Sequence, residues 1–200
     1  MILAGLTTGR TAAGQEVLSF TPELRAPPNS VAYGGQIFVD DITELRLSTL
    51  PPSCVVARRE VVFFEEGSRL MLERIAVSFR LKLSELTDPW TLICEPFLDG
   101  ERGPADAEQT LEQLIEMGFP RKEVDELRQL IAPHMAAYNS VLWEWAELGQ
   151  SDLLEALAAD LSEGLSPERY WWIMKIALRP SLGVTSHGEG SFAGNSGFLS

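Results

Sequence analysis

The chain has 200 residues, of which 45% are hydrophobic and 22% charged, a composition typical of a folded globular protein. Its formal charge of −13 argues against general binding to nucleic acid or anionic lipid, because an acidic surface repels phosphate groups. No apolar run is long enough to span a membrane, and the N-terminal segment lacks the basic residues of a secretory signal. We therefore expect a cytoplasmic protein with no nucleic-acid partner and no membrane partner.

Residues that commonly hold metals or cofactors are scarce. Cys54 and Cys94 lie in apolar stretches and form no CxxC pair, so we expect buried thiols, with a disulfide as the alternative. His134 and His187 belong to no HxxxH or HExxH motif, and no glycine-rich phosphate-binding motif occurs. We expect no metal site and no cofactor.

Residues 1–100 show the patterns of an antiparallel β-rich half, either a sheet or a small barrel. The clearest alternation is RIAVSFRLKL, from Arg74 to Leu83, where every second residue is apolar and would cover one face of a strand. Pro27-Pro28 and Pro51-Pro52 predict loops, and the short connections favour antiparallel pairing. Further strands are expected in EVLSF, QIFVDDITELRLSTL with a break at Asp40-Asp41, REVVFF, SRLMLE after a hairpin loop at 65–68, and WTLICEPF.

Residues 105–180 predict an acidic bundle of about five helices. This part carries much of the negative charge: residues 101–180 hold seven Lys and Arg against fifteen Asp and Glu. Helix starts are expected at Asp106, Pro120, Ser151 and Ser166, helix ends at Gly118, Gly149 and Pro180, and a break or kink at Pro133. Residues 181–200 are rich in glycine and serine without periodicity, and we expect a flexible tail.

The segment Met117-Gly118-Phe119, between two expected helices, has two interpretations. It resembles the first loop of a ubiquitin-associated domain, a three-helix bundle in which this loop contributes to an apolar patch that binds ubiquitin. The matching residues are Leu114, Met117, Gly118, Phe119, Val124 and Leu127, while Arg128 and Pro133 depart from the family's pattern. The other interpretation, which we favour, is a helix boundary, in which Gly118 ends one helix, Phe119 packs inward and Pro120 begins the next helix.

Tryptophan is concentrated in the helical half, which holds Trp143, Trp145, Trp171 and Trp172 among the five of the chain. Neighbouring positions on a helix diverge by about 100°. The helix expected from Pro167 to Leu178 is polar only at Glu168, Arg169 and Lys175. It is therefore apolar nearly all round, as expected for a helix at the centre of a bundle or against a partner. A tryptophan-rich core, or a seam between the two halves, explains the same pattern. Exposed aromatic rings would instead serve as anchors for a partner.

These features together predict a non-catalytic intracellular protein that binds a protein partner as an adaptor, assembly factor or regulatory subunit. The candidate partner-binding residues are Met117, Phe119, Trp143, Trp145, Trp171 and Trp172. One alternative is a structural subunit of a larger assembly, and a homo-oligomer stays open. Another is an enzyme with a polar site at the β/α seam, although Asp40, Asp41, Glu44 and Arg58 form no recognisable catalytic motif.

Overall fold

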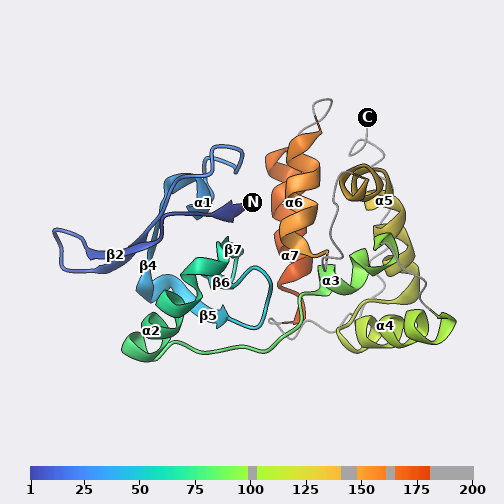
Figure 1. The fold of residues 1–200 in the computed structure, drawn as a ribbon, viewed down its shortest axis with the longest axis horizontal. Helices are drawn as coiled ribbons and strands as arrows, with labels where there is room; N and C mark the ends of the chain where they lie inside the picture. Colours follow the sequence, from blue (N-terminus) through green and yellow to red (C-terminus); the bar gives the residue numbers. More distant parts are fainter. Residues whose placement is uncertain (99–102, 141–147, 161–164, 181–200) are drawn as a thin grey trace.

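A computed structural model describes residues 1–98, 103–140, 148–160 and 165–180 (Figure 1). Strands lie mainly in the N-terminal half and helices in the C-terminal half, so the predicted α+β class is confirmed. In the described residues, α6 and α7 lie between the strands and the remaining helices of the C-terminal half (Figure 1).

The first sheet has four strands in the order β1-β7-β6-β5. These are β1 (Ile2–Leu3), β5 (Ile42–Arg46), β6 (Ser53–Val56) and β7 (Glu60–Phe64). β5, β6 and β7 form an antiparallel meander, as predicted, and every residue of β6 and β7 is buried. β1 pairs with β7 in parallel, which the expectation of purely antiparallel pairing did not include. A long connection through the second sheet makes this parallel pairing feasible.

The second sheet has three antiparallel strands in the order β2-β3-β4. These are β2 (Thr7–Arg10), β3 (Glu16–Ser19) and β4 (Gln36–Phe38). The short helix α1 (Val31–Gly34) precedes β4, and a 3-10 turn at Val39–Asp41 follows it. The break predicted at Asp40-Asp41 is therefore confirmed, because this turn separates β4 from β5.

The strand predicted from Arg74 to Leu83 is wrong, because most of it belongs to helix α2 (Arg69–Phe79). A 3-10 turn at Glu66–Ser68 leads directly into α2, so the hairpin loop and the strand SRLMLE are wrong as well. The buried positions Leu72, Ile75 and Ala76 follow the helical spacing, whereas Val77 is 81% exposed. Only the end of the segment lies along the sheet, where Leu83 bridges Leu45 of β5.

The strand predicted in WTLICEPF is also wrong, because these residues form helix α3 (Pro89–Cys94) and a 3-10 turn at Glu95–Phe97. The Asp88 carboxylate accepts a hydrogen bond from the Trp90 amide (3.0 Å), and Pro89 lies in the first turn. Aspartate followed by proline is a common helix start. The apolar run alone does not distinguish a short buried helix from a buried strand.

The C-terminal half contains α4 (Pro104–Glu116), α5 (Arg121–Asn139), α6 (Gln150–Ala159) and α7 (Pro167–Ala177). The boundary between α4 and α5 is as predicted, with Gly118 in the left-handed conformation (φ 87°) and Pro120 immediately before α5. Ser166 caps α7 by accepting a hydrogen bond from the Arg169 amide (3.3 Å), also as predicted. The segment after Pro133, predicted as a further helix, continues α5 as far as Asn139. Residues 141–147 of that prediction, and the predicted tail at 181–200, lie outside the described residues.

Three helix boundaries differ from the prediction. Asp106 is not the N-cap of α4 but its third residue, and its carboxylate accepts from the Gly103 amide (3.1 Å). Ser151 lies inside α6, whose N-cap is Gly149. Pro133 does not break α5, because the helix continues to Asn139 with Ile131 and Met135 buried on either side. Packing of these side chains compensates for the one amide donor that proline removes from the helix.

The buried apolar residues of the two halves form one continuous cluster. The predicted division into a domain at 1–100 and a domain at 105–180 stays a prediction. Polar contacts also join the halves: the Trp90 indole N–H, for example, donates to the Ile173 carbonyl oxygen of α7 (3.1 Å).

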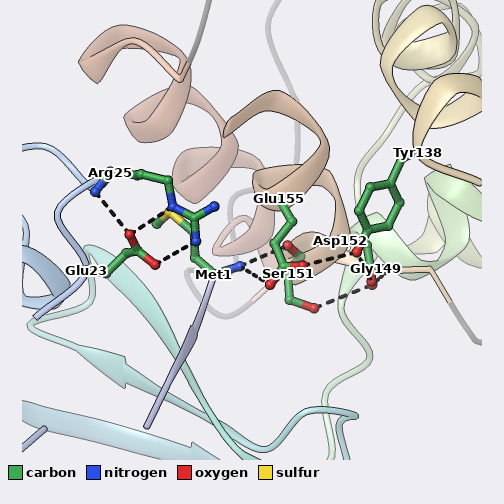
Figure 2. A network of polar contacts seen from close by, with 8 residues as sticks. All are labelled: Met1, Glu23, Arg25, Tyr138, Gly149, Ser151, Asp152 and Glu155. Carbon is green, nitrogen blue, oxygen red and sulfur yellow. Dashed lines mark hydrogen bonds and ion pairs between the residues drawn. The ribbon is translucent and has the colours of Figure 1, made fainter. Parts of the chain in front are cut away.

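A buried amino group links β1 to the helices (Figure 2). The amino group of Met1, which is 3% exposed, donates to the Ser151 carbonyl oxygen (3.2 Å) and to Glu155 Oε1 (3.1 Å). The other Glu155 oxygen accepts from the Tyr138 hydroxyl of α5 (3.1 Å), which also contacts Asp152 Oδ1 (3.4 Å). Burial lowers the pKa of the Met1 amino group, and the Glu155 carboxylate opposes that shift.

Candidate functional site

A shallow pocket of about 400 Å³ lies where the β6–β7 turn meets α7. We call it the Trp171 pocket, and its lining residues are Asn29, Arg58, Arg59, Trp171, Lys175 and Leu178. Asn29 precedes α1, the two arginines belong to the β6–β7 turn, and the other three residues belong to α7 or follow it directly. The pocket is therefore assembled from three segments that are distant in the sequence.

The indole ring of Trp171 is half-buried and is held in a fixed orientation. The Arg59 guanidinium lies over one face of the ring, 4.1 Å from its centroid. The indole N–H donates to Asn29 Oδ1 (3.3 Å), and the Tyr170 ring meets the indole edge to face with centroids 5.1 Å apart. A cation over an aromatic face contributes about 0.5–1 kcal/mol at an exposed site, enough to favour one orientation of the ring.

The turn that carries both arginines has an unusual backbone. Ala57 and Arg58 adopt positive φ angles of 50° and 53°, and the Arg59 amide closes the turn by donating to the Val56 carbonyl oxygen (3.0 Å). Positive φ at two successive positions is typical of tight hairpin turns, which normally use asparagine, aspartate or glycine there. Alanine and arginine adopt this conformation at some cost in free energy, and strained turns of this kind are concentrated at functional sites.

A buried hydrogen-bond network lies directly behind the pocket and connects its three segments. The Glu60 carboxylate, next to Arg59, accepts from the Tyr170 hydroxyl (2.6 Å), from the Ser30 hydroxyl, and from the Val31 amide (3.0 Å). Ser30 follows Asn29 in the chain, and Tyr170 precedes Trp171. Burial, with the nearby Glu60 carboxylate, raises the pKa of Tyr170, so its hydroxyl keeps its proton and remains a donor. The network thereby fixes the positions of the pocket residues.

The charge of the pocket contrasts with that of the whole chain. Arg58, Arg59 and Lys175 are all exposed, and none of them forms an ion pair with a carboxylate of the described residues. Elsewhere in the described residues cations are commonly paired: Arg179 binds both oxygens of Glu123, and Arg46 binds Glu44. A protein of net charge −13 therefore presents a local cluster of three positive charges around an aromatic ring, with no ion-pair partner in the part of the chain that the structure describes.

The predicted site residues do not form one surface. Trp172 points away from the Trp171 pocket and packs edge to face against the buried Trp90 ring, with centroids 5.6 Å apart. Phe119 is fully buried, with the Arg179 guanidinium 4.0 Å from the centre of its ring. Met117 is half-buried, and Trp143 and Trp145 lie outside the described residues. The partner-binding role of these residues stays a prediction, and among them Trp171 lines the pocket described above.

The sequence analysis missed Asn29, Arg59 and Lys175, and it considered Arg58 only for a polar site at the seam. Lys175 could have been found, because it follows Trp171 by one helical turn and so shares its face. The Arg58-Arg59 pair in a turn of an acidic chain was a second indication. The proximity of Asn29 to Trp171 depends on the tertiary fold, since the two are 142 positions apart.

A second hollow of about 350 Å³ lies at the seam between the halves, where the sequence analysis placed an alternative enzymatic site. Its charged lining includes Arg46, whose guanidinium is paired with Glu44 (2.7 Å), and Asp88, whose carboxylate accepts from the Trp90 and Gln150 amides. Burial raises the pKa of Asp88. The Asp88 contacts cap α3 and α6, and the Glu44 carboxylate neutralises the buried Arg46 charge, so a structural role accounts for both lining residues.

Cys54 and Cys94 are free and buried, as the sequence predicted. We expect neither thiol to react with a disulfide reagent in the folded protein at pH 8, because burial blocks access and raises both thiol pKa values. Colorimetric thiol titration should therefore detect no fast-reacting cysteine without denaturant and both cysteines in guanidinium chloride. Rapid labelling of either thiol without denaturant would contradict its burial.

Comparison with protein-family models, curated proteins and solved structures gives no match. No helix among the described residues has the length and apolar character needed to cross a membrane. Within the same residues, no three His, Cys, Asp or Glu side chains gather as a metal-ligand set. The described residues thus show an α+β fold with a cationic, aromatic pocket at the junction of the β6–β7 turn and α7.

Proposed function

We propose that the protein is a non-catalytic binding protein that holds a protein partner at the Trp171 pocket. The observation that carries this proposal is the position of the Trp171 ring, which lies half-exposed between Arg59 and Asn29 instead of inside the core. Adaptor, assembly factor and regulatory subunit are all forms of this function. A cytoplasmic setting belongs to the same proposal and is supported by the two free thiols.

The residue types in the pocket are those that contribute most to protein interfaces. Tryptophan, tyrosine and arginine are enriched among the residues whose truncation weakens binding most. The Trp171 ring is also oriented before any partner arrives, through its contacts with Arg59, Asn29 and Tyr170. A partner therefore does not have to order this side chain, which lowers the entropic cost of association.

The rigid surroundings of the pocket support the same function. The Glu60 network joins the turn, the segment before α1 and α7 through buried hydrogen bonds. A surface built on such a framework presents the same shape to each partner molecule, as preformed interfaces usually do. The pocket is shallow, so it suits one side chain of a partner and its neighbours.

Site-specific photo-crosslinking in cells of the source organism tests the proposal. A photoreactive amino acid at position 175, at the rim of the pocket, should give a discrete higher-mass adduct, because this exposed position lies beside Trp171 and its substitution leaves Trp171, Arg58 and Arg59 in place. The same group at position 112, exposed on α4, is the matched control and should give no such adduct. Adding Trp171→Ala to the position 175 variant should remove the adduct while circular dichroism remains unchanged.

Equal adducts from positions 175 and 112 would contradict the proposal, because they would show non-specific contacts. An adduct from position 175 that survives Trp171→Ala would also contradict it, since the ring would then contribute nothing to the interaction.

A further inference from the structure

We infer that the segment bound at the Trp171 pocket is an acidic peptide of the partner, with carboxylates opposite Arg58, Arg59 and Lys175 and one apolar side chain against Trp171. This inference rests on the proposed function and specifies the chemistry of the partner. It is carried by the three cations that have no ion-pair partner in the described residues and by the aromatic ring at their centre.

The arrangement of donors suits carboxylates. Arg58 is exposed at the tip of the turn, where its planar guanidinium can bind both oxygens of one carboxylate. Arg59 is held over the indole ring, and one of its terminal nitrogens makes only a long contact with the Asn29 carbonyl oxygen (3.4 Å). Lys175 supplies a third positive group one helical turn beyond Trp171. An acidic segment can thus contact cations on both the turn and the helix.

The apolar part of the pocket defines the other half of the ligand. Leu178 is buried in the wall of the pocket, and the exposed part of the Trp171 ring lies beside it. An aliphatic or aromatic side chain placed there would bury apolar surface, and the flanking carboxylates would fix its register. Such a segment alternates acidic residues with at least one apolar residue.

The overall charge of the protein favours a short acidic segment over nucleic acid or a lipid surface. Electrostatic interactions between exposed charges are screened beyond about 8 Å at physiological salt, so a short peptide responds mainly to the three local cations. A nucleic acid or an anionic membrane covers more of the surface and would meet the remaining acidic residues, which bring the chain to −13.

The test uses fluorescence anisotropy with the full chain and defined probes. The main probe is a labelled dodecapeptide of glutamate and aspartate with one central leucine, and its matched control carries glutamine and asparagine in place of the acids. A single-stranded oligonucleotide of the same length and vesicles containing phosphatidylserine are the other probes. We expect saturable binding of the acidic peptide, at least about tenfold weaker binding of the neutral peptide, and weaker acidic binding as salt is raised.

Charge reversal identifies the site. The double variant Arg58→Glu with Lys175→Glu should weaken binding of the acidic peptide by about tenfold or more. The matched control, Arg74→Glu with Lys122→Glu, reverses two exposed cations outside the pocket and changes the net charge equally, so it should alter binding by less than about twofold. Circular dichroism and the unfolding midpoint of both variants verify that they are folded.

Each contrary outcome has a defined meaning. Equal binding of the acidic and neutral peptides, both lost in Trp171→Ala, would overturn the acidic chemistry and leave the proposed function standing. Binding of the oligonucleotide or the vesicles without the peptide, or of no probe at all, would overturn the inference, while the crosslink from position 175 tests the proposed function separately. A dimer in size-exclusion chromatography that the Arg58→Glu/Lys175→Glu variant abolishes would show a second copy as the occupant and also overturn it.

Discussion

Replacing Glu44 by alanine is expected to lower the free energy of unfolding by about 3–5 kcal/mol. Glu44 Oε1 accepts from Arg46 Nη2 (2.7 Å) and Nε (3.1 Å), and the Arg46 side chain is only 2% exposed. The substitution removes the carboxylate and leaves the guanidinium charge inside the protein. Urea unfolding followed by circular dichroism measures the change.

Lys82 provides the control for this prediction, because it contacts the other oxygen of the same carboxylate. Its ammonium group lies 3.5 Å from Glu44 Oε2, but its side chain is 68% exposed. Solvent screens such a pair, so Lys82→Ala should change the free energy of unfolding by less than about 1 kcal/mol. If Glu44→Ala and Lys82→Ala lowered the free energy of unfolding by similar amounts, burial of the Glu44–Arg46 pair would not determine how much that pair stabilises the fold.

Replacing Phe119 by alanine is the second large expected effect, a loss of about 3–5 kcal/mol in the free energy of unfolding. The ring is fully buried, and the substitution leaves a cavity beneath Arg179, which Glu123 holds over the ring through two contacts of 2.6 and 2.8 Å. Chemical denaturation of the purified variant measures the loss.

Met117→Ala is the matched control in the same segment. Met117 is half-buried, so its truncation should cost less than about 1.5 kcal/mol. If Phe119→Ala were no more costly than Met117→Ala, the helix-boundary interpretation of this segment would fail, because Phe119 would then contribute little to the core. The left-handed Gly118 and the buried Phe119 both support that interpretation.

Local features with a single physical meaning were predictable from the sequence. Gly118 and Pro120 mark a helix boundary because each residue restricts or permits particular backbone angles wherever it occurs. The run Glu60–Phe64, with two valines and two phenylalanines, becomes β7. β7 is an inner strand of the four-stranded sheet, and all of its residues are buried. In these cases the local backbone conformation that the residues prefer is also the one that the tertiary packing requires.

The failure at α2 has a specific cause. Alternating residues from Ile75 to Leu83 fit a strand, but Ile75 and Ala76 also lie three and four positions after Leu72, and the tertiary fold uses that helical pattern. No side-chain cap marks the start of α2, since the Ser68 side chain makes no capping hydrogen bond. The segment therefore carries two competing periodicities, with no side-chain cap to favour the helix over the strand.

The candidate site was predictable in part. Trp171 was identified because tryptophan is an uncommon residue and was concentrated in the helical half. The contribution of Asn29, Arg58 and Arg59 depends on the docking of α7 against the β6–β7 turn, to which the buried Glu60–Tyr170 hydrogen bond contributes. Contacts across such sequence separations are not encoded in local periodicity.

Nuclear magnetic resonance of ¹⁵N-labelled indole groups tests most directly whether Trp171 is the ring that meets the partner. The resonances of Trp171 and Trp90 are assigned by their absence in Trp171→Phe and Trp90→Phe. Titration with the acidic dodecapeptide should shift the Trp171 resonance and leave that of the buried Trp90 in place. Saturable binding of the peptide with no change at Trp171 would contradict the account.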